Sequence, residues 1–584
     1  MLDPGRIAKS SPTSKTFSPS AIFAKWSTGY SLIFLTLATL ACLLPFSNKA
    51  FHMDDPLFLW TAHHIAQHPL DPYGFRVVWY ATESPIAEVT KNPPLASYYA
   101  AAAGSLFGWS ERALHFAFLL PALAVVLSTY QLARHFTQFP LLAALATLLA
   151  PGFLVSSTTV MCDVLMLAFW ILALLFWLHG ADSGSHFSLF AAALLIAACA
   201  LTKYFGVALI PLLLLYSFFK KRRLEPSLAY LAIPILPLGL YQYWTRALYG
   251  RGMLSDAVQY ASLHNRGHEL SLLAKLLVGL AFAGGCALPA LFLAPLLWSK
   301  RTLAILLSIC GLTGLAIGGH RAWFESSQAA AHWPLIATEM TIFLLGGISC
   351  LGVAGKAPRH ASQKINADNM LLALWVAGTF LFAVFINWTV NARSILPLIP
   401  AAGILLARRV EDSGLPAKPN LLSHLLVKVG APLVASGVVA LWVAQADGNL
   451  ANAGRTAATR AYVELRPAPD APVYVEGHWG FQYYMQQRGA LPADLRRSPF
   501  RAGDIVVIPE NTTNSFGPPP GFTLAGSVIE IDTRTSVTTM SQPLGAGFYA
   551  SLWGPLPFTF GPVPPERYLL ARLVLAPGNP NPAP

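Results

Sequence analysis

Long apolar segments recur along this sequence, and they restrict the fold more than any other feature does. A helix needs about 20 mainly apolar residues to cross the hydrocarbon core of a bilayer, and it must satisfy its own backbone hydrogen bonds there. Only 11% of the residues are charged, against about 25% in a typical soluble protein. We therefore predict an all-α polytopic membrane protein. Its candidate spans are 29–46, 94–107, 112–134, 139–155, 160–180, 186–202, 204–219, 227–245, 272–298, 302–317, 333–354, 369–388, 394–407 and 422–443.

Lysine and arginine residues gather in short clusters between these segments, which is typical of cytoplasmic loops and not of a nucleic-acid-binding surface. The clusters lie in 1–28, 220–223, 300–301, 356–364 and 408–409. Loop 47–93, loop 246–271 and the chain after 444 then lie on the opposite side of the membrane. Returning from loop 47–93 to residue 220 needs an odd number of crossings, but six segments lie between them. One of the short segments 94–107 and 139–155 is therefore not a full span, which predicts about 13 transmembrane helices.

The composition changes after residue 445, where proline, glycine and polar residues become frequent and no spanning segment follows. The runs VYVEG, DIVVIP and SVIEID have the composition of β-strands, and FQYYMQQ between the first two has that of a helix. The predicted domains are a cytoplasmic tail (1–28), a transmembrane domain (29–445), a small soluble extracytoplasmic α/β domain (446–575) and a disordered tail (576–584).

The loop after the first apolar segment, 47–93, is too long for a tight connection, and it carries two adjacent carboxylates, Asp54 and Asp55. The segment DDPLFLWTAHHIAQH, which they open, is predicted to form an amphipathic helix with Pro56 in its first turn. One interpretation is structural, because carboxylates at a helix N-terminus interact favourably with the helix dipole. The other is a functional site at the membrane surface, to which the loop acid Glu83 could also contribute.

Three further ionisable residues lie within or at the edges of apolar segments: Asp163, Lys203 and Arg393. A charge in the bilayer core costs a few kcal/mol or more, so such residues usually face a cavity or an opposite charge. A basic residue alone is better explained as an interfacial anchor whose side chain reaches the head groups. Several of them on the outer side of one helical bundle favour a shared polar site.

Four motifs in this order resemble those of a known family. They are the acid pair after the first span, the loop end TKNPPLASYY, the turn ALTKYFG and the late segment NARSILPLIP. The chain is similar to the multispanning glycosyltransferases with the C-type fold, in particular the protein O-mannosyltransferase group and the aminoarabinose transferase of lipid A. The resemblance covers roughly residues 29–410 and implies sugar transfer from a polyprenyl-phosphate donor.

The resemblance also implies roles for individual residues. Asp54 matches the catalytic acid that acts as a general base, and Asp55 stands where the family usually has a glutamate. Lys203 and Arg393 match basic residues expected near the donor phosphate, with Ser394 in place of the family's tyrosine.

Residues 91–94, Lys-Asn-Pro-Pro, fall where the lipid A branch has Glu-Lys-Pro-Pro. The acid of that motif is missing here, so a metal or acceptor contact from this position is not implied. Lys91 is a third candidate for the donor phosphate. Asn92, together with Asp163 and Glu83, is a candidate contact to the substrates.

The implied activity is transfer of a hexose or pentose to an acceptor hydroxyl on the extracytoplasmic face. A single carboxylate base implies inversion at the anomeric carbon, by analogy with inverting hydrolases. The expected partners are the lipid-linked donor, a protein, lipid or glycan acceptor and membrane lipids, but no nucleic acid. The expected location is the bacterial inner membrane, with the active site and C-terminal domain on the periplasmic or extracellular side.

Two alternatives remain open at this stage. A transporter or lipid-binding membrane protein without catalysis would explain the apolar segments, but transporters often have two similar halves, and the sequence has no clear internal symmetry. A membrane-anchored binding protein could act through residues 446–584. The cofactor is also open. His64 and His68 have the i, i+4 spacing of metal ligands, but no third ligand is evident, so a divalent metal is neither implied nor excluded.

Overall fold

The computed structural model describes residues 28–267, 271–319, 331–355, 367–413, 426–465, 472–513 and 515–577. Within these ranges, eight helices are long and apolar enough to cross a membrane. They are built on α2 (Thr28–Leu43), α6 (Glu111–Phe136), α9 (Cys162–Ser183), α11 (Leu209–Lys221), α17 (Lys300–Gly319), α18 (Trp333–Gly355), α19 (Ala367–Leu381) and α23 (Ala431–Leu465). Residues 1–27 of the predicted N-terminal tail and residues 578–584 of the predicted C-terminal tail lie outside these ranges.

Shorter helices complete the bundle. Two of them are mainly apolar, α10 (His186–Thr202) and α14 (Leu272–Cys286). The others are α5 (Leu95–Phe107), α7 (Pro140–Leu148), α8 (Pro151–Ser156), α12 (Ile235–Tyr249), α13 (Met253–Gly267), α15 (Pro289–Phe292), α16 (Ala294–Leu297), α20 (Ala392–Ile395) and α21 (Leu398–Asp412). Short 3-10 turns are η1 (Leu44–Phe46), η2 (Tyr204–Ala208) and η3 (Pro226–Ala232), and π-helical turns are η6 (Phe382–Ile386) and η8 (Leu426–Gly430).

The two short segments, one of which the charge pattern predicted to be an incomplete span, both differ from the long helices. Segment 94–107 forms the 13-residue helix α5. Segment 139–155 is divided into α7 and α8, and Pro151 begins the second piece, because proline cannot continue the hydrogen bonding of a preceding helix. The polytopic, mainly helical fold with a strand-containing C-terminal part is thus confirmed, whereas the count of 13 spans is not.

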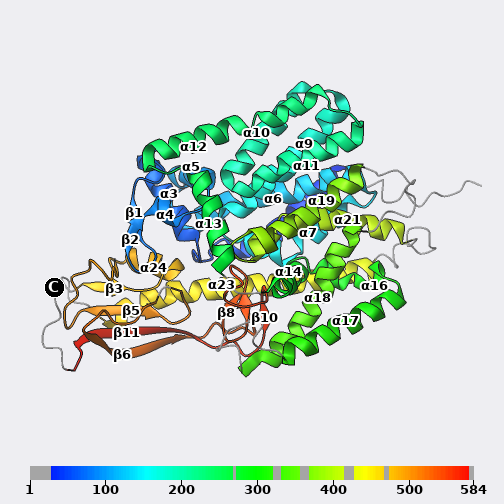
Figure 1. Cartoon of the computed structure of the whole chain (residues 1–584). Helices are drawn as coiled ribbons and strands as arrows, with labels where there is room; N and C mark the ends of the chain where they lie inside the picture. The colour runs from blue at the N-terminus through cyan, green and yellow to red at the C-terminus, as the bar shows by residue number, and fades with distance from the viewer. Residues whose placement is uncertain are drawn as a thin grey trace, which may run out of the picture.

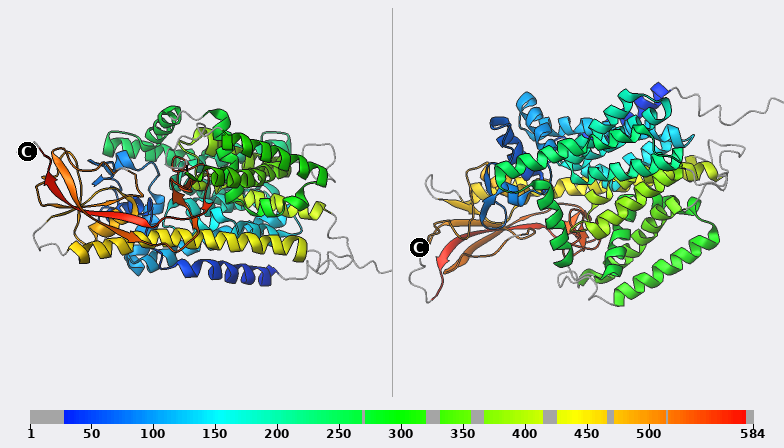
Figure 2. Two further views of the ribbon diagram at one scale, coloured as in Figure 1. Left: turned by 90° about the horizontal axis from the view of Figure 1, so that it is seen from below. Right: turned by 45° about the horizontal axis from the view of Figure 1, so that its top comes forward.

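The helices pack closely where small residues meet. Gly284 of α14 lies against α18, and a Cβ atom added to it would lie 1.9 Å from the carbonyl oxygen of Phe343. In the same way, Gly347 of α18 lies close to the backbone of Leu280 in α14. Small residues allow this close approach of helix backbones, which favours helix association in membranes. Helix α2 lies at the edge of the bundle, against α6 and α7 (Figure 2).

The C-terminal residues form a five-stranded sheet in the order β4-β3-β5-β11-β6 at one end of the bundle (Figure 1). Its strands are β3 (Val473–Val475), β4 (Leu491–Pro492), β5 (Ile505–Pro509), β6 (Phe522–Ile531) and β11 (Glu566–Leu575), and α24 (Trp479–Gln486) follows β3. Strand β3 pairs in parallel with β4 and β5, and β11 runs antiparallel to β5 and β6. The predicted strands and helix are present, but β11, which joins the two parts of the sheet, was not predicted.

The C-terminal part is not a separate body. The single helix α23 runs from the bundle to the sheet, so the predicted boundary at residue 446 lies inside it (Figure 1). The segment between β6 and β11 also returns to the bundle, where Phe548, Leu556 and Phe558 are fully buried in the same core as the membrane helices. That segment carries β7 (Val537–Thr538), β8 (Met540–Ser541), β9 (Ala546–Gly547) and β10 (Thr559–Phe560).

The outer loop 47–93 packs between the bundle and the sheet. It contains α3 (Asp55–Gln67), the hairpin β1 (Arg76–Val78) and β2 (Glu83–Pro85), and α4 (Ile86–Val89). The side chain of Gln482 in α24 donates to the carbonyl of Val78, and the backbone N–H of Leu495 donates to that of Ala81. These contacts close the loop over the end of the bundle and create the site described next.

Candidate functional site

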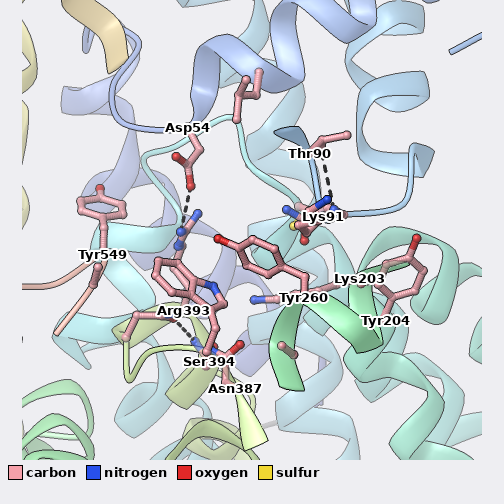
Figure 3. A pocket seen from close by; sticks show the side chains of 18 of the residues that line it. Asp54, Thr90, Lys91, Lys203, Tyr204, Tyr260, Asn387, Arg393, Ser394 and Tyr549 are labelled. Carbon is pink, nitrogen blue, oxygen red and sulfur yellow. Dashed lines mark hydrogen bonds and ion pairs between the residues drawn. The ribbon is translucent and has the colours of Figure 1, made fainter. Parts of the chain in front are cut away.

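A cavity of about 1030 Å³ lies where the outer loop, the ends of the helices and the C-terminal domain meet. Charged side chains from distant parts of the chain line it, and Figure 3 shows four of them in one view. The charged lining residues are Asp54, Lys91, Asp163, Lys203, Lys275 and Arg393. Because four are basic and two are acidic, this wall favours an anionic ligand.

Asp54 occupies the N-cap position of α3 but does not cap the helix. Its Oδ2 lies 2.9 Å from Nη2 of Arg393, and 33% of its side chain remains accessible. The preceding residue, Met53, has a φ of 48°, a left-handed conformation that is unfavourable for a long side chain. The backbone therefore turns where the carboxylate of Asp54 enters the cavity (Figure 3).

Asp55 does not line the cavity. Its buried carboxylate accepts hydrogen bonds of 2.8 Å from the backbone N–H groups of His52 and Val160. Burial raises its pKa to about 7, although these two donors and the nearby Lys49 act in the opposite direction. Asp55 thus ties the outer loop to the turn before α9, so the expectation of a catalytic pair is corrected to one carboxylate in the cavity and one buried behind it.

Arg393 lies in the short helix α20, and the C-terminal segment holds the loop that leads to it. The carbonyl of Phe548 accepts from the N–H of Ala392, and the N–H of Ser551 donates to Val390. The guanidinium itself is poorly satisfied, because Nη1 contacts the sulfur of Met161, a weak acceptor, and the buried Nε has no partner among the described residues. Such a group favours an additional anion.

Lys203 lies where α10 ends and η2 begins, in an extended conformation (φ −151°, ψ 130°). This turn needs Gly206, because a Cβ atom there would lie 2.5 Å from the backbone nitrogen of Ala200. The Nζ of Lys203 pairs at 2.6 Å with Oδ1 of Asp163, whose other oxygen is buried without a partner among the described residues. Asp163 and Lys203 were predicted to face a cavity or an opposite charge, and they do both, because they line the cavity and pair with each other.

Lys91 and Asn92 also line the cavity. The Nζ of Lys91 lies 2.6 Å from Asp256 of α13 and 5.2 Å from the ring centre of Tyr260 on the same helix. Arg251 links this helix to the loop through Asp256 and Glu88. Helix α13 therefore forms one wall of the cavity.

Glu83 lies outside the cavity, in contrast to the expectation that it contacts substrate. Its carboxylate pairs with Arg76 at 3.0 Å and with Arg497 at 2.7 Å, and its backbone N–H donates to Asp494. It joins the β1–β2 hairpin to the C-terminal domain. Of the predicted site residues, six line the cavity, and Asp55 and Glu83 do not.

The sequence interpretation missed the C-terminal residues of the site. His478, Trp479, Tyr549 and Trp553 line the cavity, and the ring of Tyr549 lies 5.6 Å from the guanidinium carbon of Arg393. Burial lowers the pKa of His478 to about 4, so its imidazole is neutral at physiological pH.

A buried polar network positions Tyr549. Asp447 accepts from the hydroxyls of Tyr549 and Thr539, and it pairs with Lys49. Both Lys49 and Asp447 adjoin apolar runs in the sequence. Charged residues in such positions were the signal that could have indicated this network.

Two histidines of α3, which were considered as metal ligands or as neighbours of them, contact aromatic rings. His63 stacks on Trp109 with ring centres 3.7 Å apart, and His64 packs on Phe75. Among the residues that the structure describes, no three His, Cys, Asp or Glu side chains are grouped as a metal site would require.

Comparison with protein families finds one match. Residues 91–244 match the model of the dolichyl-phosphate-mannose-protein mannosyltransferases. For this part of the chain, the match confirms the resemblance that the motifs indicated. A comparison with curated proteins finds no match.

Solved structures of membrane transferases are also similar. The oligosaccharyltransferase of Archaeoglobus fulgidus aligns with a TM-score of 0.46 and 14% identity over 83% of this chain, which spans 65% of that protein. ArnT from Cupriavidus metallidurans aligns with a TM-score of 0.43 and 14% identity over 83% of this chain and 93% of its own. The Pmt1-Pmt2 O-mannosyltransferase complex of S. cerevisiae aligns with a TM-score of 0.30 and 16% identity, covering 41% of this chain and 36% of that chain.

Proposed function

We propose that this protein is an integral-membrane glycosyltransferase that moves a sugar from a polyprenyl-phosphate donor to an acceptor hydroxyl, with inversion at the anomeric carbon. The observation that carries the proposal is the cavity in which Asp54 and Arg393 pair beside Lys203 and Lys91. It combines one accessible carboxylate with several basic groups, which are the two requirements of this reaction.

Asp54 takes the proton of the acceptor hydroxyl as the oxygen attacks the anomeric carbon of the donor. The bond from that carbon to the phosphate oxygen breaks, and the phosphate leaves as an anion that needs no protonation. Negative charge grows on the phosphate in the transition state, so prepositioned cations stabilise it by a few kcal/mol each. Arg393 and Lys203 are suited to this role, because Arg393 lacks strong partners for two of its nitrogens and Lys203 lies on the same wall.

The ion pair between Asp54 and Arg393 has a specific consequence in this scheme. In the structure, one guanidinium nitrogen of Arg393, Nη2, pairs with the carboxylate of Asp54. A bound phosphate would compete for the guanidinium, because arginine forms strong charge-assisted hydrogen bonds with phosphate oxygens. The carboxylate would then gain freedom to accept a hydrogen bond from the acceptor hydroxyl. Lys91, which is held by Asp256 and Tyr260, would contribute to the same positive field.

The rim of the cavity supports a lipid-linked donor. Val258 of α13, Leu272 of α14 and Ile386 of η6 line it, and their side chains are exposed. Exposed apolar side chains beside a basic cavity suit a molecule with a phosphate head and a hydrocarbon tail. The π-helical turn η6, an irregularity that often marks functional sites, lies at this rim. The arrangement fits an active site at the extracytoplasmic surface of a bacterial inner membrane, with the C-terminal domain on the same side.

The proposal is tested by incubating the purified full-length protein with radiolabelled polyprenyl-phosphate sugars and membranes. Label should appear in a protein, lipid or glycan fraction only when the protein and a lipid-linked donor are both present. Labelling from a nucleotide sugar alone, or no labelling with any lipid-linked hexose or pentose, would contradict the proposal. A transporter would instead move labelled lipid between leaflets without forming a glycosylated product.

A further inference from the structure

One part of the cavity wall has no role in the chemistry proposed above. It comes from the C-terminal domain and is mainly aromatic, with Trp479 at its centre. Trp479 begins α24 and is only partly buried, whereas its neighbours His478 and Trp553 are at most 6% exposed. An accessible indole is thus presented on a wall of buried rings.

The backbone of Trp479 is strained. Its φ of 66° is left-handed, a conformation that is unfavourable for a bulky side chain and that concentrates at ligand-binding sites. The next residue, Gly480, lies so close to the outer loop that a Cβ atom would be 2.0 Å from the carbonyl oxygen of Phe51. Close packing of α24 against the loop therefore imposes the strain, which leaves the indole in the cavity.

Neighbouring rings hold the indole in place. Trp553 contacts it at 5.4 Å and 66°, and His478 contacts it at 5.3 Å and 69°, so neither of these two rings stacks flat on it. His478 is itself fixed, because it stacks on Trp79 at 4.4 Å and is hydrogen-bonded to the hydroxyl of Thr513 and the carbonyl of Trp79. A rigid aromatic surface of this kind binds a ring-shaped ligand with little loss of side-chain entropy.

Tyr549, one ring of the aromatic wall, lies on one side of the proposed base. Figure 3 shows Tyr549 beyond Asp54 and Arg393 on one side, and Lys91 and Lys203 on the other. Trp553 follows Tyr549 in the same inserted segment and contacts Trp479. In an in-line displacement, the acceptor approaches from the side opposite the leaving phosphate, so a phosphate held at Lys91 and Lys203 would leave the side of Tyr549 to the acceptor.

We propose that Trp479 is the platform on which the acceptor stacks, and that this acceptor is a carbohydrate. The inference rests on the proposed function and assigns the acceptor class that it leaves open. The C–H groups on one face of a pyranose ring carry partial positive charge and pack on the negative face of an indole. Hydroxyls at the ring edge can then reach Asp54.

The other acceptor classes fit this wall less well. A peptide recognised in extended form needs a free strand edge, but no residue of the five described sheet strands lines the cavity. An acyl chain would bind to the aliphatic rim at Val258, Leu272 and Ile386, on the side of the helices α13 and α14. The aromatic wall comes from the C-terminal residues, with Trp479 and His478 beside α24 and with Tyr549 and Trp553 in the inserted segment, and an aromatic surface of this kind suits a water-soluble ligand with one apolar face.

The test is a binding measurement without donor, so it does not depend on catalysis. Fluorescently labelled di- and trisaccharides of glucose, galactose, mannose and N-acetylglucosamine, and a threonine-rich peptide of similar size, are titrated against the full chain in lipid nanodiscs. At least one saccharide should bind, and Trp479→Ala should weaken its binding by roughly tenfold. Trp479→Phe should retain part of the affinity. Trp442→Ala, which removes an exposed indole on α23 away from the cavity, should change nothing.

The outcomes separate the two proposals. Saccharide binding that depends on Trp479 supports the inference even if no donor is found to be used. Equal binding by wild type and Trp479→Ala, binding of the peptide alone, or no binding at all would overturn the inference, and labelled transfer to protein or lipid could still establish the proposed function. A purely structural role is distinguished by Trp479→Gly, which relieves the positive φ. It should melt at a higher temperature than Trp479→Ala yet bind saccharide no better.

Discussion

Two adjacent aspartates have different environments, and the difference comes from their backbone. Asp55 directs its carboxylate to the N–H groups of His52 and Val160 in the protein interior. Asp54, one residue earlier, is left to face the cavity and Arg393. The structural interpretation, an acid that serves only the N-terminus of its own helix, does not describe Asp54 fully, because its side chain forms no capping hydrogen bond to α3.

Replacing Asp54 by asparagine keeps the size of the side chain and removes its basicity. We expect sugar transfer to fall by at least about a hundredfold, since a positioned general base contributes about 10²–10⁴-fold. The rate of label transfer under saturating donor measures this effect, with the melting temperature as a check on folding. The matched control is Glu88→Gln, which changes another ion-paired carboxylate of the outer loop and should leave the rate unchanged. Full activity of Asp54→Asn would refute the role of base.

Lys203 should act on the donor and not on the acceptor. We expect Lys203→Ala to raise the Michaelis constant for the polyprenyl-phosphate sugar by roughly 10–100-fold, with nearly unchanged acceptor affinity. The substitution also leaves Asp163 buried without its partner, which is costly in itself. The double variant Lys203→Ala with Asp163→Asn removes that complication and should keep the donor defect. An unchanged donor Michaelis constant in both variants would count against the assignment.

At the scale of elements, patterns within one segment predicted α3, α24 and the strands β3, β5 and β6. Strand β11 was missed, because ERYLLARLVL has polar residues at spacings that do not alternate, and its assignment depends on the two strands that flank it. The interruption between α7 and α8, by contrast, can be predicted from the sequence alone, because Pro151 begins the second helix.

The first residue of β11, Glu566, should make folding stability depend on pH. Burial raises its pKa from 4.5 to about 8, although Asn511 donates to both of its oxygens. A raised acid pKa favours the protonated folded state, so this contribution is complete below about pH 4.5 and is lost as the pH rises towards 8. A tenfold difference in proton affinity between the folded and unfolded states corresponds to about 1.4 kcal/mol, so the loss should amount to a few kcal/mol.

Thermal unfolding in detergent at pH 5 and pH 8 measures this prediction. The stability of wild type relative to Glu566→Gln should fall between the two pH values, because glutamine does not titrate. Glu510→Gln, an exposed neighbour that pairs with Arg567, serves as the control and should show no such change. A constant difference between wild type and Glu566→Gln would show that the buried carboxyl does not titrate in this range.

At the scale of the whole molecule, the C-terminal domain and the bundle share one core. Phe548, Leu556 and Phe558 return from the sheet into the bundle, and the backbone N–H of Phe560 donates to the buried Glu339 of α18. The same segment holds the loop of Arg393 in place. The site therefore depends on contacts between residues that are far apart in the sequence.

Truncation at residue 445 should therefore unfold the bundle and not merely remove an appended domain. It deletes more than half of α23 and the core aromatic residues of the inserted segment, and loss of each buried phenylalanine typically costs about 3–5 kcal/mol. Size-exclusion chromatography in detergent should show aggregated protein. Removal of residues 578–584 alone is the control and should leave a monodisperse, stable protein. A monodisperse and active truncated bundle would show that the two parts fold independently.

The local pattern of apolar runs, basic clusters and turn residues was enough to predict the membrane class, most helices, three strands and five of the six charged residues that line the cavity. These properties depend on hydrophobicity and backbone preferences within a few residues. The meeting of Asp54, Lys203 and Arg393, the burial of Asp55 and the aromatic wall around Trp479 were decided only by tertiary packing. The residues that contact them are distant in the chain, and the sequence of one segment does not determine which distant segment packs against it.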